Sequence, residues 1–324
     1  MKKKYNVFNI PTGVGASIGG FAGDAGSYAR KFAKNFPLIV NPNVVNAACF
    51  SSITDNMLYV EGWSLTEFFK GNISFKPSFN NKIGIIFDKS ISQEVLNIHI
   101  NTINAVKTVY GINVLGYIIS DDEVGVEFFK TESGISLGNI KNPETLVEAG
   151  KKMIAQGADV LAVVCKFEEA EDDGYENGEN VDVVGGAEAL ISHYVSQKLY
   201  VPVVHAPAFN DYAIKSKIVH PKAAAEYITP TFLPCLLLGL NSAPLLKKGF
   251  NKNFITIDDV KSLIMPYNSL GASIVTNALE KGIKVIAVKE NQTVLNANVF
   301  NLQLENDIIL MDSYKDCLEY LKRL

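Results

Sequence analysis

The sequence predicts an α/β protein of two Rossmann-like lobes, with mostly parallel sheets and a cleft between the lobes. Short runs rich in β-branched residues alternate with amphipathic stretches of helical length, which is typical of βαβ units. The chain has 324 residues, against roughly 150 in an average domain, so about two lobes are expected. With 48% hydrophobic and 20% charged residues, it has enough apolar side chains for sizeable cores.

The alternation assigns the individual elements. The clearest helix begins at Asn142-Pro143-Glu144, because asparagine caps helices well and proline is tolerated in the first turn, and it ends at Gly157. Further helices are expected near residues 24–35, 91–110, 185–199, 270–281 and 312–323. Strands are expected near residues 5–10, 38–41, 83–88, 112–119, 159–165, 201–205, 262–266, 283–288 and 308–311.

One lobe is expected to be discontinuous in sequence. Residues 71–81 lack periodicity and are assigned as a connector. The strands at 5–10 and 262–266 are expected in one sheet, so that the loops after them open at the same edge. The expected units are a glycine-loop lobe of residues 1–78 plus 230–324, a second α/β lobe of residues 82–210, and an irregular connection of residues 211–229.

Charge and composition exclude several partners. The formal net charge is −4, which gives no general attraction to a phosphate backbone or an anionic membrane. No nucleic acid and no membrane partner is therefore expected, and the longest apolar run, 232–240, is about half a membrane span. A cytoplasmic location is expected. Only Arg30 and Arg323 are arginines, so anion recognition would depend mostly on backbone N–H groups.

The cysteines indicate neither a disulfide scaffold nor a metal centre. They are far apart, with no C-x-x-C pair and no histidine at ligand spacing, so no structural metal is predicted. No redox cofactor is predicted either, because the glycine-rich segment near the N-terminus is not a clean dinucleotide fingerprint. Cys165 ends a strand and is interpreted as an inert buried thiol rather than a nucleophile. The cysteines are Cys49, Cys165, Cys235 and Cys317.

The glycine-rich segment Pro11–Asp24, PTGVGASIGGFAGD, is the main candidate for ligand binding. Glycines at this density allow positive φ and let backbone N–H groups approach a carboxylate or phosphate closely. A tight strand-to-helix connection that needs glycine for packing alone is the alternative. The expected ligand-binding residues here are Gly13, Gly15, Gly19 and Gly20.

A second loop repeats this pattern. Ile10 to Ile18 resembles Met265 to Ile274, since each has a strand, a proline, a short loop and then Gly-Ala-Ser-Ile. Two such loops in one parallel sheet open at the same carboxyl edge, so both are expected to line one pocket. A polar cluster, 289–293, follows the next strand. The residues expected to bind ligand are Asn268, Gly271 and Ser273 in the loop, with Asn291 and Thr293 in the cluster.

His205, Asp24 and Glu290 are the expected catalytic residues. His205 ends a strand and is followed by Ala206-Pro207, which places it at the edge where α/β sites lie. It would act as general acid or base, with Asp24 or Glu290 as its counterpart. A structural histidine and a helix-capping aspartate remain the alternatives. The acidic stretch 168–180 is interpreted as an exposed loop rather than a cation site.

Several long motifs resemble the domain-of-unknown-function 3326 family of bacteria and plant plastids. The match includes IPTGVG at 10–15, NPNVVN at 41–46, LYVEGWSL at 58–65, GAEALISH at 186–193, VPVVHAPA at 201–208 and AVKENQTVL at 287–295. A histidine is common in the family where this chain has Asn41. The resemblance implies that these polar motifs belong to one architecture, and it adds Asn43, Asn46 and Glu61 to the expected ligand-binding residues.

Together these features predict a small-molecule enzyme without a redox cofactor, a lyase, isomerase or transferase. Its expected partner is a small anionic metabolite that carries a carboxylate or phosphate, held by glycine-rich helix N-termini. The alternatives are a non-catalytic metabolite or nucleotide sensor with the same pocket, and a scaffold subunit whose glycines only pack. A homo-oligomer stays open.

Overall fold

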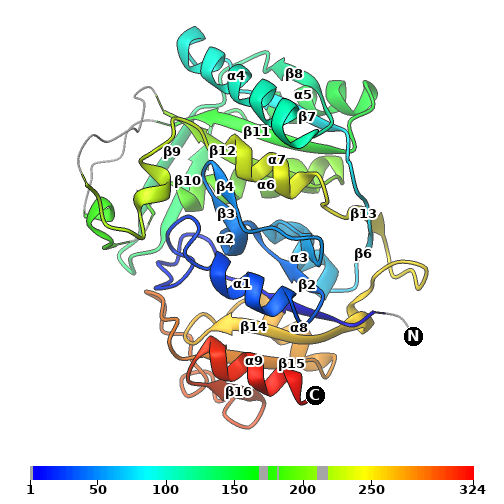
Figure 1. Ribbon diagram of the computed structural model, residues 1–324, viewed down its shortest axis with the longest axis vertical. Coiled ribbons are helices and arrows are strands. Elements are labelled where there is room, and N and C mark those ends of the chain that lie inside the picture. The colour runs from blue at the N-terminus through cyan, green and yellow to red at the C-terminus, as the bar shows by residue number, and fades with distance from the viewer. Residues whose placement is uncertain (1–2, 168–173, 181, 210–217) are drawn as a thin grey trace.

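The computed structural model describes residues 3–167, 174–180, 182–209 and 218–324. Its two parallel sheets lie one above the other in Figure 1, and both chain ends lie beside the larger sheet. Each sheet carries helices on both faces, as βαβ connections require. The predicted fold class, α/β with mostly parallel sheets, is confirmed.

The large sheet contains both glycine-loop strands. Its order is β16-β15-β14-β1-β2-β5, and every pair is parallel. Because β1 pairs directly with β14, the two similar loops start from neighbouring strands. The strands are β1 (Tyr5–Phe8), β2 (Leu38–Val40), β5 (Met57–Tyr59), β14 (Val260–Pro266), β15 (Lys284–Val288) and β16 (Ile308–Met311).

Alternation along β1 shows how the large sheet is covered. Phe8 faces α1 (Gly26–Ala33) and α9 (Tyr314–Lys322), where its ring lies 5.7 Å from that of Phe32 and 4.9 Å from that of Tyr314. Val7 points to the opposite face and belongs to the core under α3 (Gly62–Phe69) and α8 (Ser273–Glu280). Successive side chains of a strand alternate between faces, so this one strand serves two cores.

The small sheet has the order β12-β11-β7-β8, again with parallel pairs. One face packs in a core with α4 and α7, and the other with α5 and α6. The strands are β7 (Ile83–Phe87), β8 (Val114–Ile119), β11 (Val160–Lys166) and β12 (Val203–Ala208). The helices are α4 (Gln93–Tyr110), α5 (Pro143–Ala155), α6 (Gly185–Leu199) and α7 (Leu233–Leu240).

Small antiparallel pairs join the two lobes. The expected connector 71–81 contains β6 (Ile73–Lys76), which pairs with β13 (Leu245–Lys248). The segment does connect the two sheets, but it is not irregular throughout, because β6 occupies part of it. The apolar run 232–240 forms the buried helix α7, with proline in its first turn. The remaining elements are β3 (Asn46–Ala47), β4 (Phe50–Ser51), β9 (Val126–Lys130), β10 (Ser136–Ile140), α2 (Pro42–Val45) and the 3₁₀ turns η1 (Tyr175–Asn177), η2 (Ala224–Glu226) and η3 (Ile257–Asp259).

The chain passes between the sheets twice. It leaves the large sheet through β6, builds the small sheet, and returns through β13 to β14. Helix α7 packs on β11 and β12 although it belongs to the part expected in the glycine-loop lobe. The exact domain bounds stay a prediction. Among the described residues, no helix is long and apolar enough to cross a membrane.

Candidate functional site

The glycine loop, residues 11–25, lies against the small-sheet lobe. The Ser136 N–H donates to the Gly13 carbonyl at 3.0 Å, and the Tyr175 hydroxyl donates to the Gly20 carbonyl at 3.3 Å. Lys222 donates from Nζ to the Ser17 carbonyl at 3.1 Å. These contacts come from a hairpin, a 3₁₀ turn and a loop of the other half of the chain. We call the region around them the interlobe site.

The loop uses its glycines in two ways. Gly13, Gly15, Gly19 and Gly23 have positive φ, which glycine adopts without strain. Gly20 has no such φ, but a Cβ there would lie 2.1 Å from the Ala16 carbonyl oxygen. Packing and backbone conformation therefore both require glycine in this segment.

Protein groups already accept several N–H groups of the loop. The Gly19 N–H donates to Asp24 Oδ1 at 2.6 Å, and the Ala22 N–H donates to Glu226 Oε1 at 2.8 Å. The Ile18 N–H donates to Asn291 Oδ1 at 3.0 Å. Two of these acceptors are carboxylate oxygens, so part of the expected anion cradle holds carboxyl groups of the protein itself.

Four acidic side chains surround this part of the loop: Asp24, Asp182, Glu188 and Glu226. Burial is the main cause that raises each pKa, for Asp24 to about 6 and for Glu226 to about 7. The negative charge of Asp182 raises the pKa of Glu226 and of Glu188 further. Burial also raises the pKa of Asp182. The pKa values of Asp24 and Glu226 therefore lie closer to neutral pH than those of ordinary carboxyl groups.

Tyr175 connects the cluster to the loop. Its hydroxyl donates to Glu226 Oε1 at 2.8 Å, and its ring stacks on Phe21 with centroids 4.5 Å apart. Burial and the neighbouring Glu226 carboxylate raise its pKa well above the usual range, so it stays a hydrogen-bond donor. Within the described residues, Asp24 Oδ2 and Glu188 Oε1 are buried oxygens without a hydrogen-bond partner.

His205 lies on β12 beside Glu188. Its Nδ1 is 2.8 Å from Ser192 Oγ, and its Nε2 is 3.8 Å from Glu188 Oε2. At that distance two charged groups would form an ion pair, but burial shifts them in opposite directions. It lowers the pKa of His205 to about 3, with help from His193, and raises the pKa of Glu188. Burial therefore favours the uncharged form of both members of the pair.

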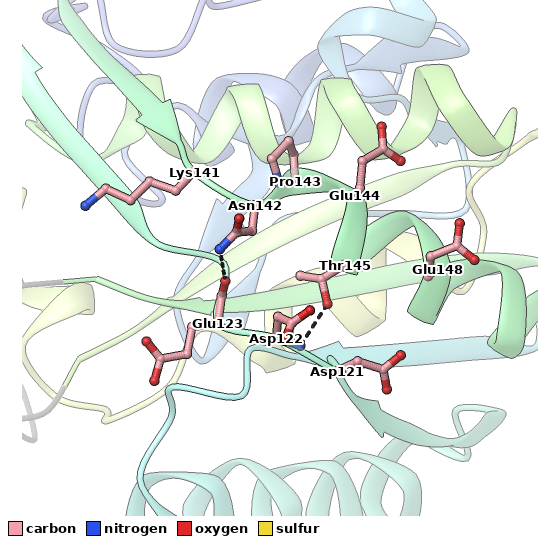
Figure 2. Close-up of a pocket in the computed structure, with 9 residues that line it drawn as sticks. All are labelled: Asp121, Asp122, Glu123, Lys141, Asn142, Pro143, Glu144, Thr145 and Glu148. Carbon is pink, nitrogen blue, oxygen red and sulfur yellow. Dashed lines mark hydrogen bonds between the residues drawn. The ribbon is translucent and has the colours of Figure 1, made fainter.

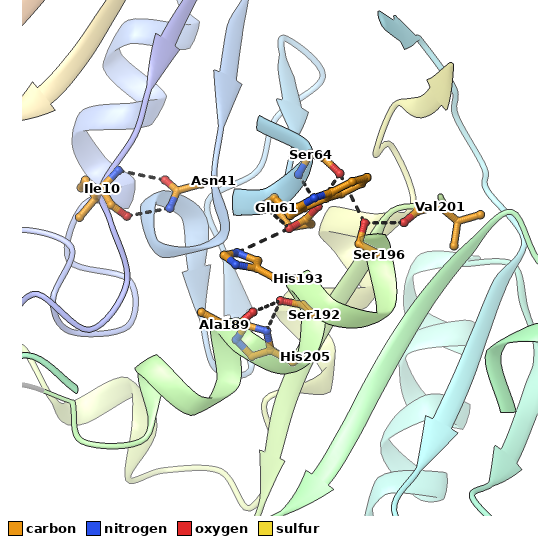
Figure 3. A network of polar contacts seen from close by, with 11 residues as sticks. Ile10, Asn41, Glu61, Ser64, Ala189, Ser192, His193, Ser196, Val201 and His205 are labelled. Carbon is orange, nitrogen blue, oxygen red and sulfur yellow. Dashed lines mark hydrogen bonds and ion pairs between the residues drawn. The ribbon is translucent and has the colours of Figure 1, made fainter. Parts of the chain in front are cut away.

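A second histidine joins the lobes (Figure 3). His193 on α6 points toward Glu61, with Nε2 and Oε2 3.7 Å apart. Glu61 is buried and caps α3, accepting the N–H groups of Trp63 and Ser64 at 2.7 Å each. A Cβ at Gly62 would lie 2.5 Å from His193 Nε2, so glycine allows this close approach. Glu61 therefore has a structural role as the N-cap of α3, in addition to any role in ligand binding.

The second loop, residues 266–273, is held by hydrogen bonds to the chain that follows β15. Asn268 donates from Nδ2 to the carbonyls of Thr293 and Leu295 and accepts the N–H and hydroxyl of Thr293 at Oδ1. Asn291 likewise bonds the Ile18 backbone on both sides, the Ser17 hydroxyl and the Tyr314 hydroxyl. Because an amide has two donors and one acceptor oxygen, both side chains have their hydrogen bonds inside the protein.

The other expected ligand residues lie in several places. Gly271 and Ser273 are exposed at the start of α8, where a Cβ at Gly271 would meet Ala297 Cβ at an ordinary 3.4 Å. Asn43 donates to the Pro11 carbonyl at 3.4 Å, and Asn46 accepts the Tyr59 hydroxyl at 3.1 Å. Asn43 is thus the one of these that touches the glycine loop directly.

The expected catalytic residues are only partly brought together. Asp24 is not the cap of the first helix, which begins at Gly26 after Ala25. Its carboxylate instead folds back to the Gly19 N–H. Glu290 is exposed and accepts the Tyr314 N–H at the start of α9. The partners of His205 are Ser192 and Glu188, and Glu290 is not among them.

Cys165 and the acidic stretch contribute little to the site. Cys165 is buried, and burial raises its pKa well above the usual range, which keeps it a thiol. Residues 168–173 of the acidic stretch lie outside the described residues. In the described part of the chain, no group of three or more His, Cys, Asp or Glu is arranged to hold a metal ion.

A surface pocket of about 540 Å³ lies elsewhere, between the end of β8 and the start of α5 (Figure 2). Its wall is mostly acidic, and two of its hydrogen bonds are local: Asn142 to the Glu123 carbonyl and the Asp122 N–H to Thr145. It contains none of the expected site residues. Its lining is Asp121, Asp122, Glu123, Lys141, Asn142, Pro143, Glu144, Thr145 and Glu148.

Sequence reasoning did not single out Asp182, Glu188, Glu226 or Tyr175. Glu188 lies in the GAEALISH motif, in the first turn of a helix that starts with two glycines, and that context is a usable signal. Tyr175 lies within the acidic stretch 168–180, which was expected to be an exposed loop. Nothing around Glu226 in the sequence distinguishes it from a surface glutamate, because its burial comes from distant chain segments.

These features define an α/β protein whose two lobes enclose buried acid and histidine groups beside a glycine loop. Residues 5–322 match the family described as Protein of unknown function (DUF3326), and the chain belongs to this family, as the motifs indicated. A relative from Synechococcus sp., named an uncharacterized lipoprotein, is 33% identical over 306 residues, which are 92% of this chain and 84% of the relative.

Similarity to solved structures is slight. A crystal structure from Mycobacterium smegmatis in complex with β-D-fucofuranose aligns with 64% of this chain and 74% of that chain. The sequence identity is 11% and the TM-score is 0.22, which is too low to inform either fold or ligand.

Proposed function

We propose that the protein is a non-redox enzyme for a small metabolite, with its proton-transfer groups in the interlobe site. One observation carries this proposal: Asp24 and Glu226 come from distant parts of the chain, yet N–H groups of the same glycine loop hold both carboxyls. A group that titrates near the working pH is most effective as general acid or base. Buried groups with perturbed pKa values in one cluster are a frequent mark of catalytic sites.

The His205–Glu188 pair would complement these two carboxyl groups. A carboxylic acid donates a proton and a neutral imidazole accepts one, so the pair contains both functions without net charge. Ser192 orients the ring through Nδ1. We propose that His205 and Asp24, with Glu226 and Glu188, carry the proton transfers of a lyase, isomerase or transferase.

The proposed ligand is a metabolite with a carboxylate or phosphate and with hydroxyl or amino groups. The anionic group would bind at the glycine loop, where backbone N–H groups supply partial positive charge. Several donors between Ser17 and Asp24 already have protein acceptors, so we place the anionic group nearer Gly13 and Gly15. Hydroxyl or amino groups would face the acidic side chains.

The test combines binding with turnover. Thermal-shift screening against metabolites of this class identifies a ligand, and mass spectrometry of the incubated mixture reports conversion. We expect Glu226→Gln and Asp24→Asn to keep binding within about tenfold and to lower turnover by about 100-fold or more. Glu148→Gln, at an exposed position in the surface pocket, is the matched control and keeps full activity.

The alternatives predict other results. A sensor would bind its ligand without conversion, in the wild type and in both variants alike. A scaffold subunit would show no ligand-dependent shift at all. Either result would overturn the enzyme proposal.

A further inference from the structure

The edge strand β8 differs from the other sheet edges. Leu115, Tyr117 and Ile119 are 41%, 44% and 42% exposed, although they are large apolar residues. The opposite edge of the small sheet, β12, is almost wholly buried, and so is the β5 edge of the large sheet. The β16 edge is half-buried. An apolar, exposed edge strand is a ready template for pairing with another strand.

The backbone of β8 has an open side. The Ser120 N–H donates to the Phe87 carbonyl at 2.8 Å, so Ser120 directs its backbone toward β7. Because residues alternate along a strand, Ile118 also faces β7, whereas Tyr117 and Ile119 direct their N–H and C=O groups outward. Within the described residues, β7 is the strand that pairs with β8.

From this edge we infer that a second copy of the chain pairs with β8 in antiparallel orientation, about a two-fold axis at Ile118. Tyr117 of each copy would then lie opposite Ile119 of the other, and each such pair would exchange two backbone hydrogen bonds. Aromatic residues opposite β-branched residues are favourable cross-strand pairs. The two small sheets would become one continuous sheet.

Charge supports a second copy as the occupant. The strand is followed by the acidic run Asp121-Asp122-Glu123, whose side chains are exposed and line the pocket of Figure 2, with Asp121 also paired to Lys152. Beside its start lie two exposed lysines: Lys82, directly before β7, and Lys107, in the last turn of α4. Antiparallel pairing brings the acidic end of each copy toward the basic end of the other. The edge is therefore self-complementary, as a two-fold interface requires.

The apolar surface continues onto α4. Val109 and Tyr110, at the end of that helix, are 71% and 57% exposed. A short strand alone buries less than the ~1,200 Å² of a typical stable interface, so these residues would contribute to the contact. We expect a modest affinity, with a dissociation constant on the order of micromolar.

The first test is the mass of the full chain in solution. Sedimentation or light scattering should show the dimer at about 100 µM and the monomer after dilution to well below ~1 µM. Ile119→Lys should keep the chain monomeric throughout. Phe129→Lys, which changes an exposed apolar residue of β9 in the same way, is the control and should leave the dimer intact. A wild-type chain that is monomeric throughout, or a dimer that survives Ile119→Lys, would overturn the inference.

The second test reads the register, and it does not depend on a destabilised variant. Tyr117→Cys and Ile119→Cys are prepared separately and oxidised alone or mixed. Residues opposite each other in a hydrogen-bonded pair have Cα atoms about 5.5 Å apart, within disulfide range. Mixing should give a cross-linked dimer that neither variant gives alone. Cross-linking of Phe129→Cys to the same extent would refute the proposed interface.

Discussion

The two strand-to-helix loops of the large sheet begin from neighbouring strands and share the sequence Gly-Ala-Ser-Ile, yet their surroundings differ. The glycine loop after β1 meets the other lobe and binds the carboxyls of Asp24 and Glu226. The loop after β14 is held by Asn268, whose side chain bonds Thr293 and Leu295 and whose carbonyl accepts the Ala297 N–H. Similar sequences at one sheet edge therefore give one loop open to titratable groups and one closed loop.

The difference comes from the segments that reach each loop. The 3₁₀ turns η1 and η2, from the middle of the chain, bring Tyr175 and Glu226 to the first loop. The chain that follows β15 contacts both loops, through Gln292 at Ser17 of the first and through Ala297 at Asn268 of the second. Loop sequence thus sets the backbone conformation, whereas distant segments set the chemistry.

The largest contrast is expected from adding one methyl group to each loop. Gly20→Ala should destabilise the protein by about 3 kcal/mol or more, because the Cβ would overlap a backbone carbonyl that cannot move freely. Gly271→Ala should change the free energy of unfolding by less than about 0.5 kcal/mol, since its Cβ has ordinary contacts. Urea unfolding measures both. Equal losses would show that the loops are packed alike.

The next contrast concerns the polar side chain in each loop. Asn268→Ala should cost about 2 kcal/mol or more, because it leaves the Thr293 N–H and two carbonyls unpaired. Asp24→Asn should cost about 1 kcal/mol or less, because an amide oxygen still accepts the Gly19 N–H. Denaturant midpoints compare the two variants. A larger loss of stability for Asp24→Asn would mean that the Asp24–Gly19 hydrogen bond stabilises the fold more than the hydrogen bonds of Asn268 do.

The dependence of stability on pH should separate the loops more finely. Burial raises the pKa of Glu226 from 4.5 to about 7, so the folded state holds this proton more tightly than the unfolded state. Its stabilising contribution is complete below pH 4.5 and is lost as the pH rises to 7. Glu226→Gln should therefore match the wild type near pH 4 and exceed its stability by up to about 3 kcal/mol above pH 7.

The control for this pH series lies on the helix that follows the second loop. Glu280, at the end of α8, is exposed, and Glu280→Gln should change the free energy of unfolding by less than about 0.5 kcal/mol. Thermal unfolding in a series of buffers supplies the measurement. A constant difference for Glu226→Gln would mean that Glu226 ionises in the folded protein as it does in the unfolded chain.

The smallest effect is expected at Ser273. This residue is exposed at the start of α8 and does not cap the helix with its side chain. Ser273→Ala should change stability by less than about 0.5 kcal/mol and ligand affinity by less than about twofold. Titration with the ligand found by screening checks this. A tenfold loss of affinity would bring the second loop into the binding site and erase the contrast between the loops.

Periodicity was enough to predict most of the fold. The strands of the small sheet and the amphipathic helices α4, α5 and α6 follow from the spacing of apolar residues and, for α5, from the proline in its first turn. The Asn142 side chain, expected to cap α5, instead bonds the Glu123 carbonyl. Periodicity did not reveal α7, because it is apolar on all sides, nor β6, because an edge pair of four residues resembles a loop. Both depend on tertiary contacts that local patterns do not contain.

The candidate site was harder to predict. Glycine density correctly marked a loop with unusual backbone. The expectation that His205 ends its strand was wrong, because β12 continues through Ala206-Pro207 to Ala208 and His205 lies in its middle. The carboxyl groups that surround them are ordinary residues in sequence, and only folding buries Glu226 or brings Glu188 beside His205. Electrostatic coupling between segments far apart in sequence has no local signature.

The glycine contacts of α6 also define a mechanical unit. A Cβ at Gly186 would lie 2.0 Å from the Ser136 carbonyl oxygen, and a Cβ at Gly138 would lie 2.3 Å from Ala187 Cβ, so the helix and the β9–β10 hairpin are in direct backbone contact. We expect them to move together, and Glu188 and His193 lie on this helix. The Ser136 N–H, bonded to Gly13 across the lobes, exchanges with solvent deuterium only when this unit lifts away. The exchange rate of that one amide would therefore measure how often the interlobe site opens.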